Sequence, residues 1–192
     1  DTIKDYLDLG AGDGFKTHYL AREFSLEKDN VIGLDFTSYG SVDYLAKRNK
    51  NVTFVDYEKE DVLKYPFKNS SFDLVSAFMV AHHIEDLDSF FKEINRIVKK
   101  GKYFLLADHN NVNMLDKMLT DVEHAMYETV YKRGEINLEY LKSEYTRYYD
   151  MVEWSVILEK HGFKLVTMTD YSNNLASTLT STLGFFPLYK KL

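Results

Sequence analysis

Short apolar runs alternate with helix-like segments through the first half of the chain, and this alternation constrains the fold more than any other feature. The runs that resemble strands are residues 3–9, 31–36, 52–55, 72–78 and 103–107. Strands separated by helices of about ten residues build βαβ units, which give a parallel sheet covered by helices on both faces. The sequence therefore predicts an α/β fold with a doubly wound sheet and a ligand site at the carboxyl ends of its strands.

Helices are expected between these strands at residues 15–24, 41–48 and 88–99, and Gly101 is expected to end the third helix. Further along the chain, hydrophobic spacing predicts a long amphipathic helix at 113–131 and a shorter helix at 151–160. The long helix carries an apolar stripe made of Leu115, Met118, Leu119, Val122, Ala125, Met126 and Val130.

Two last strands, at residues 163–169 and 185–190, are expected to form an antiparallel hairpin at the sheet edge. They complete a mostly parallel, seven-stranded sheet. Pro187 favours an edge strand over a central one, because proline has no amide hydrogen to donate to a neighbour.

The chain has 192 residues, which suits one domain over residues 1–192, with residues 111–150 inserted as a substrate lid. The first residue is not methionine and a strand follows almost at once, so we expect a truncated N-terminus. A larger polypeptide or a partner subunit on that side remains an open alternative.

Charge and composition exclude several classes of protein. The chain has 24 basic and 30 acidic residues, so it lacks the overall basic charge typical of nucleic-acid-binding proteins. The absence of cysteine excludes disulfides, thiolate catalysis and cysteine-based metal centres. No apolar run reaches the roughly 18 residues of a membrane span, so we expect a cytoplasmic protein without membrane contact. The histidines show no metal-binding spacing, and we expect no metal site.

The glycine-rich segment after the first strand is the clearest ligand-binding feature. Glycines between a strand and a helix let the backbone approach a ligand closely. Their spacing is G-x-G-x-G, and Phe15 stands where the dinucleotide fingerprint has its last glycine. Asp8 would repel a pyrophosphate but suits a cationic ligand, and Asp35 is placed to accept hydrogen bonds from ribose hydroxyls.

Residues 6–14, Tyr-Leu-Asp-Leu-Gly-Ala-Gly-Asp-Gly, resemble the first motif of class I S-adenosylmethionine (SAM)-dependent methyltransferases. The resemblance continues through residues 33–36, 61–67, 71–75, 81–84 and 93–101. It implies a single methyltransferase domain with the Rossmann-like fold of that family, and SAM as the cofactor.

The resemblance also implies which residues contact SAM. Asp8 and the backbone of Gly10, Ala11 and Gly12 would hold the methionine end. Asp35 would bind the ribose, and Phe36 would lie against the adenine. Further contacts to the adenine and the methionine end would come from Asp61, Val62 and Phe78.

Methyl transfer needs an acid–base residue only if the acceptor must lose a proton, so the catalytic residue depends on the acceptor. The candidates follow strands four and five. His83, Asp108 and His109 are candidates for catalysis, and the same residues with Asn110 are candidates for acceptor binding. The alternatives are a structural or positioning role for the histidine and capping of the next helix by the residues at 108–110.

The acceptor is expected to be a small molecule or RNA. Residues 108–110 and 121–124 faintly resemble methyltransferase domains of viral RNA-capping proteins. Lid tyrosines would stack on a flat substrate, and the lid carries a small basic group. These residues are Tyr140, Tyr145, Tyr148 and Tyr149, with Lys132, Arg133, Lys142 and Arg147. A non-catalytic, methyltransferase-like scaffold or stimulatory module is the alternative from another class.

Overall fold

The computed structural model describes residues 2–35, 53–56, 67–131, 146–170 and 184–192. Within them, seven strands form one sheet in the order β3-β2-β1-β4-β5-β7-β6. The strands are β1 (Tyr6–Leu9), β2 (Val31–Asp35), β3 (Thr53–Asp56), β4 (Phe72–Phe78), β5 (Val98–His109), β6 (Phe163–Asp170) and β7 (Gly184–Lys191). The helices are α1 (Phe15–Glu23), α3 (Leu87–Ile97), α4 (Met114–Tyr131) and α6 (Met151–Lys160), with short 3₁₀ turns η1 (Lys28–Asn30) and η4 (Ala81–His83).

The sheet is parallel from β3 to β5 and antiparallel where β7 joins β5 and β6. This confirms the predicted doubly wound α/β fold with its antiparallel hairpin. The chain builds outward from β1 to β3 on one side and then crosses to β4 on the other, so strand order reverses between β1 and β4. Doubly wound sheets bind ligands at the carboxyl edge of this point.

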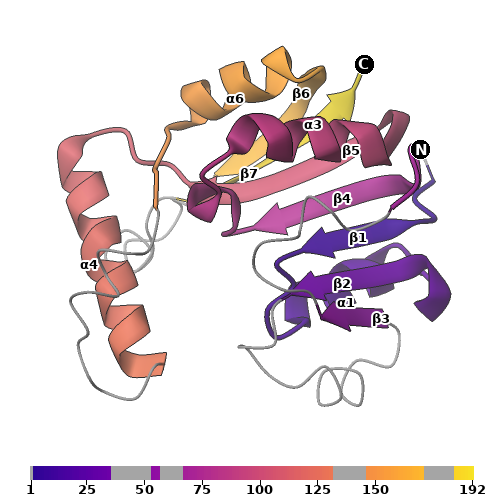
Figure 1. Cartoon of the computed structure of the whole chain (residues 1–192), viewed down its shortest axis with the longest axis horizontal. Coiled ribbons are helices and arrows are strands. Elements are labelled where there is room, and N and C mark those ends of the chain that lie inside the picture. The colour runs from indigo at the N-terminus through magenta and orange to yellow at the C-terminus, as the bar shows by residue number, and fades with distance from the viewer. Residues whose placement is uncertain (1, 36–52, 57–66, 132–145, 171–183) are drawn as a thin grey trace.

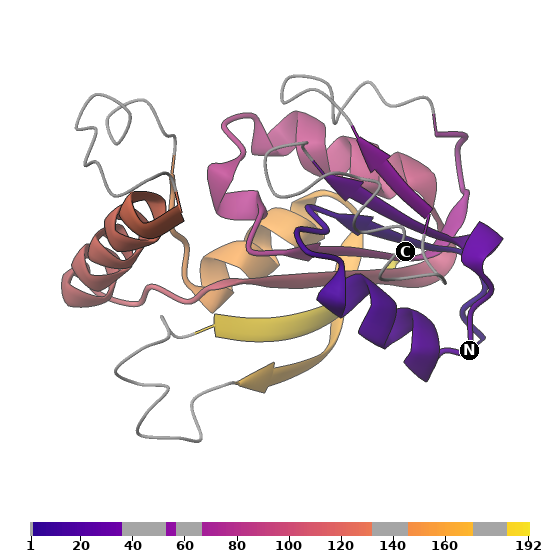
Figure 2. The same cartoon turned by 90° about the horizontal axis from the view of Figure 1, so that it is seen from below.

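Helices cover both faces of the sheet, with α3 and α6 on one face and α1 on the other (Figures 1 and 2). All four residues of β1 are buried, because neighbouring side chains point to opposite, covered faces. Leu7 and Leu9 join the larger apolar core with Phe91 and Trp154, whereas Tyr6 packs in a smaller core with Ala21 of α1.

The junction between α3 and β5 differs from the prediction. The helix ends at Ile97, and Val98 already has extended backbone angles (φ −70°, ψ 133°), so α3 leads directly into β5. Gly101, with φ +74°, lies inside β5 where the pairing with β4 is irregular. The expectation that Gly101 ends the helix is therefore wrong, and its left-handed backbone serves a bulge in the strand.

The position of Pro187 also differs from the prediction. The hairpin of β6 and β7 is confirmed, but β7 lies between β5 and β6, so Pro187 is in an internal strand. Its register partner across β7 and β6 is Met168. On the other side of β7, Leu188 pairs with Leu105 of β5 and Phe185 pairs with Asp108, and the positions between them are not paired. The pairing with β5 therefore omits Pro187, which has no amide hydrogen to donate.

Helix α4 extends beyond the carboxyl ends of the parallel strands (Figure 1). Four residues of its apolar stripe point outward: Leu115, Met118, Leu119 and Val122 are each more than half exposed. The polar Thr120, in contrast, is fully buried. None of the helices in the described ranges is long and apolar enough to cross a membrane.

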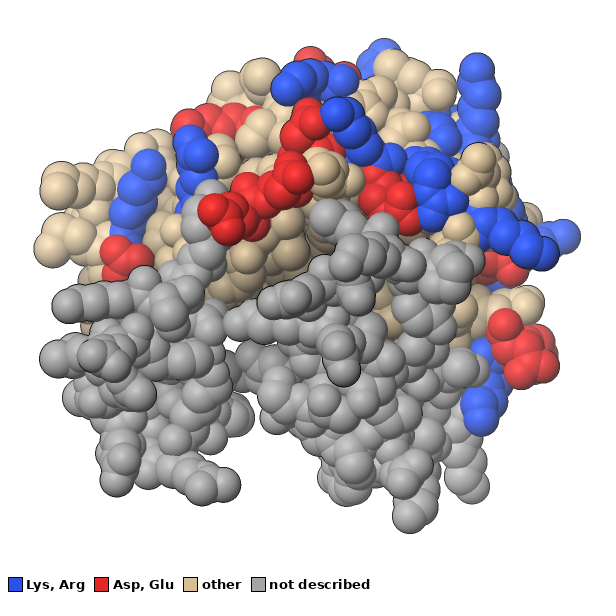
Figure 3. Space-filling model, in the orientation of Figure 1, with Lys and Arg blue, Asp and Glu red and all other residues tan. Residues whose placement is uncertain are grey.

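Acidic and basic side chains are spread over the described part of the face in Figure 3, and several lysines and arginines lie toward the edge where the strands begin. There Lys99 lies 3.2 Å from Asp73 and also contacts Asp5, and Lys102 lies 3.6 Å from Asp73. Basic residues are therefore paired with acids at the amino edge.

Candidate functional site

The glycine-rich loop after β1 is held between the ends of β2 and β4. The amides of Gly10 and Ala11 donate to the carbonyl oxygen of Leu34, at 2.8 and 3.1 Å. A side chain at residue 10 would place its Cβ 2.2 Å from Cγ2 of Val80, so only glycine fits. Gly12 has φ +56° and open space where a Cβ would stand. The loop therefore presents bare backbone at the switch point of the sheet.

Asp35, at the carboxyl end of β2, meets this loop directly. Its Oδ2 accepts a hydrogen bond from the amide of Gly12. Two residues expected to contact the cofactor from different parts of the chain thus lie together, on the edge where parallel strands end.

Asp8 lies beneath the loop, on the α1 face of the sheet, and is almost fully buried. Oδ1 accepts from the Ser76 hydroxyl at 2.6 Å, and Oδ2 accepts from the Thr17 hydroxyl of α1. The Tyr6 hydroxyl lies 2.8 Å from that of Ser76 and extends the network. Burial raises the pKa of Asp8 to about 6, although the hydrogen bonds from Ser76 and Thr17 act in the opposite direction.

The chain leaves β4 through a residue with unusual backbone angles. Met79 has φ +60°, a left-handed conformation that costs a non-glycine residue free energy, and its amide donates to the Ala107 carbonyl at 2.7 Å. Phe78 before it is buried, and the Lys16 ammonium lies 5.5 Å from the centre of its ring. This turn directs the following η4 toward the end of β5.

His82 of η4 and Asp108 of β5 form a buried pair at this edge. Nδ1 of His82 lies 2.8 Å from Oδ1 of Asp108, which also accepts from the His109 amide at 2.8 Å. Burial alone would raise the pKa of Asp108, but the charge and hydrogen bond of His82 outweigh it, and the pKa is lowered. The sequence analysis selected His83 from this turn, whereas His82 makes the buried contact.

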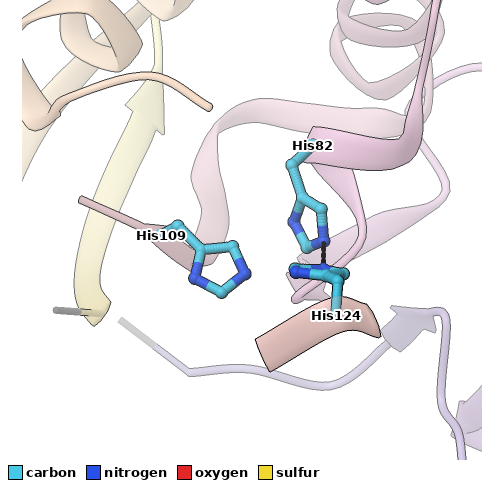
Figure 4. A group of neighbouring side chains, drawn as sticks. All are labelled: His82, His109 and His124. Atoms are coloured by element: carbon cyan, nitrogen blue, oxygen red, sulfur yellow. Dashed lines mark hydrogen bonds between the residues drawn. The ribbon is translucent and has the colours of Figure 1, made fainter. Parts of the chain in front are cut away.

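Two more imidazoles surround His82 (Figure 4). Its Nε2 lies 3.1 Å from Nε2 of His124, which comes from α4. Nδ1 of His124 lies 2.9 Å from the Thr120 carbonyl oxygen and 3.3 Å from the Tyr148 hydroxyl. His109 is 2% exposed, and neither of its ring nitrogens has a hydrogen-bond partner among the described residues. Burial, reinforced by the charge of His82, lowers the pKa of His109 to about 3.

The other candidates from the sequence have different surroundings. His83 is exposed, and its ring centre lies 4.0 Å from that of His82. The side-chain oxygen of Asn110 accepts from the Met151 amide at 3.0 Å, so it supports the first turn of α6 and not of α4.

Part of the predicted site lies outside the described residues: Phe36, Asp61, Val62, Tyr140, Tyr145, Lys132, Arg133, Lys142 and the helix at 41–48. Of the residues in the predicted lid that are described, Tyr148 lies beside the histidines. Tyr149 packs on Trp154 with 4.7 Å between ring centres, and Arg147 lies over the Tyr149 ring.

Sequence reasoning missed two residues of this site, His82 and His124. Spacing along the chain gave no metal motif, yet folding brings ring nitrogens of His82, His109 and His124 within 4.8 Å of one another. The one signal available in advance is the i, i+4 pair Thr120 and His124, which places two polar side chains on one helix face.

Comparison with known proteins agrees with this geometry. A family model described as a methyltransferase domain matches residues 7–106. The chain is 31% identical over 105 residues to a fatty-acid O-methyltransferase of Mycolicibacterium smegmatis, covering 55% of this chain and 37% of that protein. It is 28% identical over 173 residues to a demethylmenaquinone methyltransferase of Lactobacillus johnsonii, and the match covers 85% of this chain and 69% of that protein. The chain spans less than half the length of several curated relatives it matches.

Among solved structures, a SAM-dependent methyltransferase from Methanosarcina mazei superposes with a TM-score of 0.68. The match covers 100% of this chain and 94% of that chain, at 20% sequence identity. At this identity the likeness concerns the fold.

Proposed function

The chain belongs to the methyltransferase domain family, and we propose that it transfers the methyl group of SAM to an acceptor. In this proposal the donor lies across the switch point of the sheet, between the glycine-rich loop and the ends of β2 and β4. The cofactor supplies an electrophilic methyl group on a sulfonium, and the acceptor's lone pair forms the new bond while sulfur keeps the electrons of the broken one.

The observation that carries the proposal is the contact between the Asp35 carboxylate and the Gly12 amide. A carboxylate at the end of β2 suits ribose hydroxyls, because each of its oxygens can accept a hydrogen bond. Open space at Gly12 lets a ligand approach the backbone, since no side chain stands there. The arrangement favours a nucleoside whose ribose lies at Asp35 and whose other end extends along the loop.

The charges at the loop support a cationic donor over a phosphate-bearing one. Asp8 and Asp35 place two carboxyl groups at the ends of β1 and β2, and carboxylates repel a pyrophosphate. We assign the methionine end of SAM to the backbone of Gly10, Ala11 and Gly12, with the buried Asp8 as a negative group beneath them. Phe78 would close that side, and Phe36, Asp61 and Val62 would contact the adenine.

Binding of SAM is tested by calorimetric titration of the chain with S-adenosylhomocysteine. We expect binding to one site, weakened by about 1–3 kcal/mol in Asp35→Ala because charge-assisted hydrogen bonds are lost. Asp29→Ala in η1 is the control and is expected to bind like the wild type. No binding by the folded wild type would refute the donor assignment. An unchanged affinity in Asp35→Ala would mean that the ribose does not bind at Asp35.

We further propose a small-molecule acceptor, supported by the fatty acid and the demethylmenaquinone in the names of two relatives. His83, Asp108, His109 and Asn110 remain the candidates for contacting it. Among them His83 is exposed, whereas Asp108 and His109 are buried, so His83 is the candidate that a substrate reaches without rearrangement.

RNA is the second candidate acceptor. The observation favouring it is that His109 and His124, from the two segments that the sequence analysis compares with RNA-capping domains, lie together. Methyl incorporation from labelled SAM into short capped RNAs, fatty acids and quinols distinguishes the acceptors. Incorporation into RNA alone would overturn the small-molecule proposal. Binding of S-adenosylhomocysteine without methylation of any of the three classes would favour the non-catalytic module.

A further inference from the structure

We propose that His82, His109 and His124 form a binding site for one divalent cation of the zinc class. The three side chains come from η4, from the end of β5 and from α4, and each offers a ring nitrogen within 4.8 Å of the other two (Figure 4). The site lies at the carboxyl edge of the sheet, and it does not depend on the proposed methyltransferase function.

The hydrogen bonds made by Nδ1 of His82 and Nδ1 of His124 fix the tautomers of these two histidines. The Thr120 carbonyl oxygen can only accept, so Nδ1 of His124 carries the hydrogen of that 2.9 Å contact. The Asp108 carboxylate likewise accepts from Nδ1 of His82 at 2.8 Å. When both rings are neutral, each Nε2 therefore presents a lone pair, and these two nitrogens lie 3.1 Å apart.

Two lone pairs at that distance repel each other unless an electron-pair acceptor binds both nitrogens. A zinc ion with Zn–N bonds of about 2.0–2.1 Å in a tetrahedral site separates two ligand nitrogens by about 3.3 Å. The observed 3.1 Å is close to this separation, so His82 and His124 require little movement to share a cation.

His109 supplies the third ligand. Both of its ring nitrogens are buried without a hydrogen-bond partner in the described part of the chain, which is unusual for buried polar groups. Binding to a cation would satisfy one of them. One nitrogen faces the other two histidines in Figure 4.

The surroundings of the ligands match those of known metal sites in chemical type. Metal-binding histidines usually donate their other ring N–H to a carboxylate or a backbone carbonyl, the two partners seen here for His82 and His124. Three imidazoles suit Zn²⁺ and neighbouring transition metals, and three protein ligands leave a fourth position for water or a substrate atom.

A shared proton is the competing explanation. If His82 carries a proton on Nε2 as well, it donates to Nε2 of His124 across the same 3.1 Å, and no cation is needed. His109 would then remain a buried imidazole without a partner. The two explanations differ in whether the protein binds metal.

The test uses the whole chain without a polyhistidine tag, freed of metal with a chelator and titrated with ZnCl₂ and CoCl₂. We expect one ion per chain, a rise in melting temperature with zinc, and visible cobalt absorption typical of a tetrahedral nitrogen site. His124→Gln and His109→Phe are expected to lose these signals. Asp108→Asn, which replaces the charged partner of His82 with a neutral amide, is expected to weaken metal affinity about 10–100-fold.

His161→Gln is the matched control, because His161 follows α6 at the opposite edge and binds Asp88 and the Ile157 carbonyl. It is expected to keep stoichiometric binding. In the presence of chelator, the melting temperature of His109→Phe should be no lower than that of the wild type. This result would show that the variant loses metal binding without losing its fold. Failure of the wild type to bind one ion, or full binding by His109→Phe and His124→Gln, would overturn the proposal.

Discussion

Nδ1 of His82 and Oδ1 of Asp108 lie 2.8 Å apart with both side chains buried, and this contact connects the turn after β4 to the end of β5. The same carboxylate accepts from the backbone amide of His82 at 3.3 Å and from that of His109 at 2.8 Å. One buried acid therefore orients two histidines.

Replacing this acid with its neutral amide should destabilise the protein. Asp108→Asn loses charge-assisted hydrogen bonds, and we expect the free energy of unfolding to fall by about 1–3 kcal/mol. Urea denaturation at pH 7 in the presence of chelator measures this effect without a metal contribution. Stability equal to the wild type would mean that the pair contributes nothing to folding.

The two glycines of the loop should respond differently to a methyl group. Gly10→Ala places Cβ 2.2 Å from the Val80 side chain, so we expect about 1–3 kcal/mol of overpacking added to the cost of positive φ. Gly12→Ala meets open space and should cost only the backbone term, about 1 kcal/mol. Thermal denaturation compares them.

The double variant Gly10→Ala with Val80→Ala provides the control for the clash. Shortening Val80 removes the atom in contact, so the second substitution should cost less in the Gly10→Ala background than in the wild type. Additive losses would contradict the close approach.

The buried Asp8 should make stability depend on pH. Its pKa of about 6 in the folded protein exceeds the ordinary value of 3.8, so the folded state binds more protons between these values. The free energy of unfolding should therefore decline as pH rises from 4 to 6.5, by up to about 3 kcal/mol from this group.

Asp8→Asn should remove this decline, since the amide does not ionise and the Ser76 and Thr17 hydroxyls can either donate or accept. Asp29→Asn serves as the exposed control and should keep the wild-type profile. Urea denaturation across this pH range measures the slope, and a decline of equal size in Asp8→Asn would assign it to another group.

Trp154 should be a major contributor to the core. It is fully buried, with ring centres 6.2 Å from Phe91 and 4.7 Å from Tyr149. Trp154→Ala is expected to cost about 3–5 kcal/mol in the free energy of unfolding.

Trp154→Phe should cost less than half as much. The phenyl ring keeps most of the apolar contact. The indole nitrogen has no hydrogen-bond partner among the described residues, so its loss leaves no acceptor unpaired there. Equal losses in the two variants, measured by chemical denaturation, would indicate that the indole itself is required.

The sequence predicted the sheet well because hydrophobic period and glycine position are local signals. Strand β4 and helix α6 occur at the predicted bounds, and Gly12 and Asp35 meet at one edge of the sheet. The mistakes concern features that neighbours decide. Gly101 resembles a helix end, but pairing with β4 places it in a bulge, and Pro187 is tolerated internally because the β5 ladder skips it.

The sequence by itself determined an α/β sheet, a bare-backbone loop at its switch point and a carboxylate beside it, because each follows from residue order along single elements. Only the tertiary structure decided that Leu115, Met118, Leu119 and Val122 of α4 face outward while Thr120 and His124 face the site. It alone brought His82, His109 and His124 together, from positions far apart in the chain. Distances between side chains on different elements depend on how the elements pack, and no spacing within one segment encodes them.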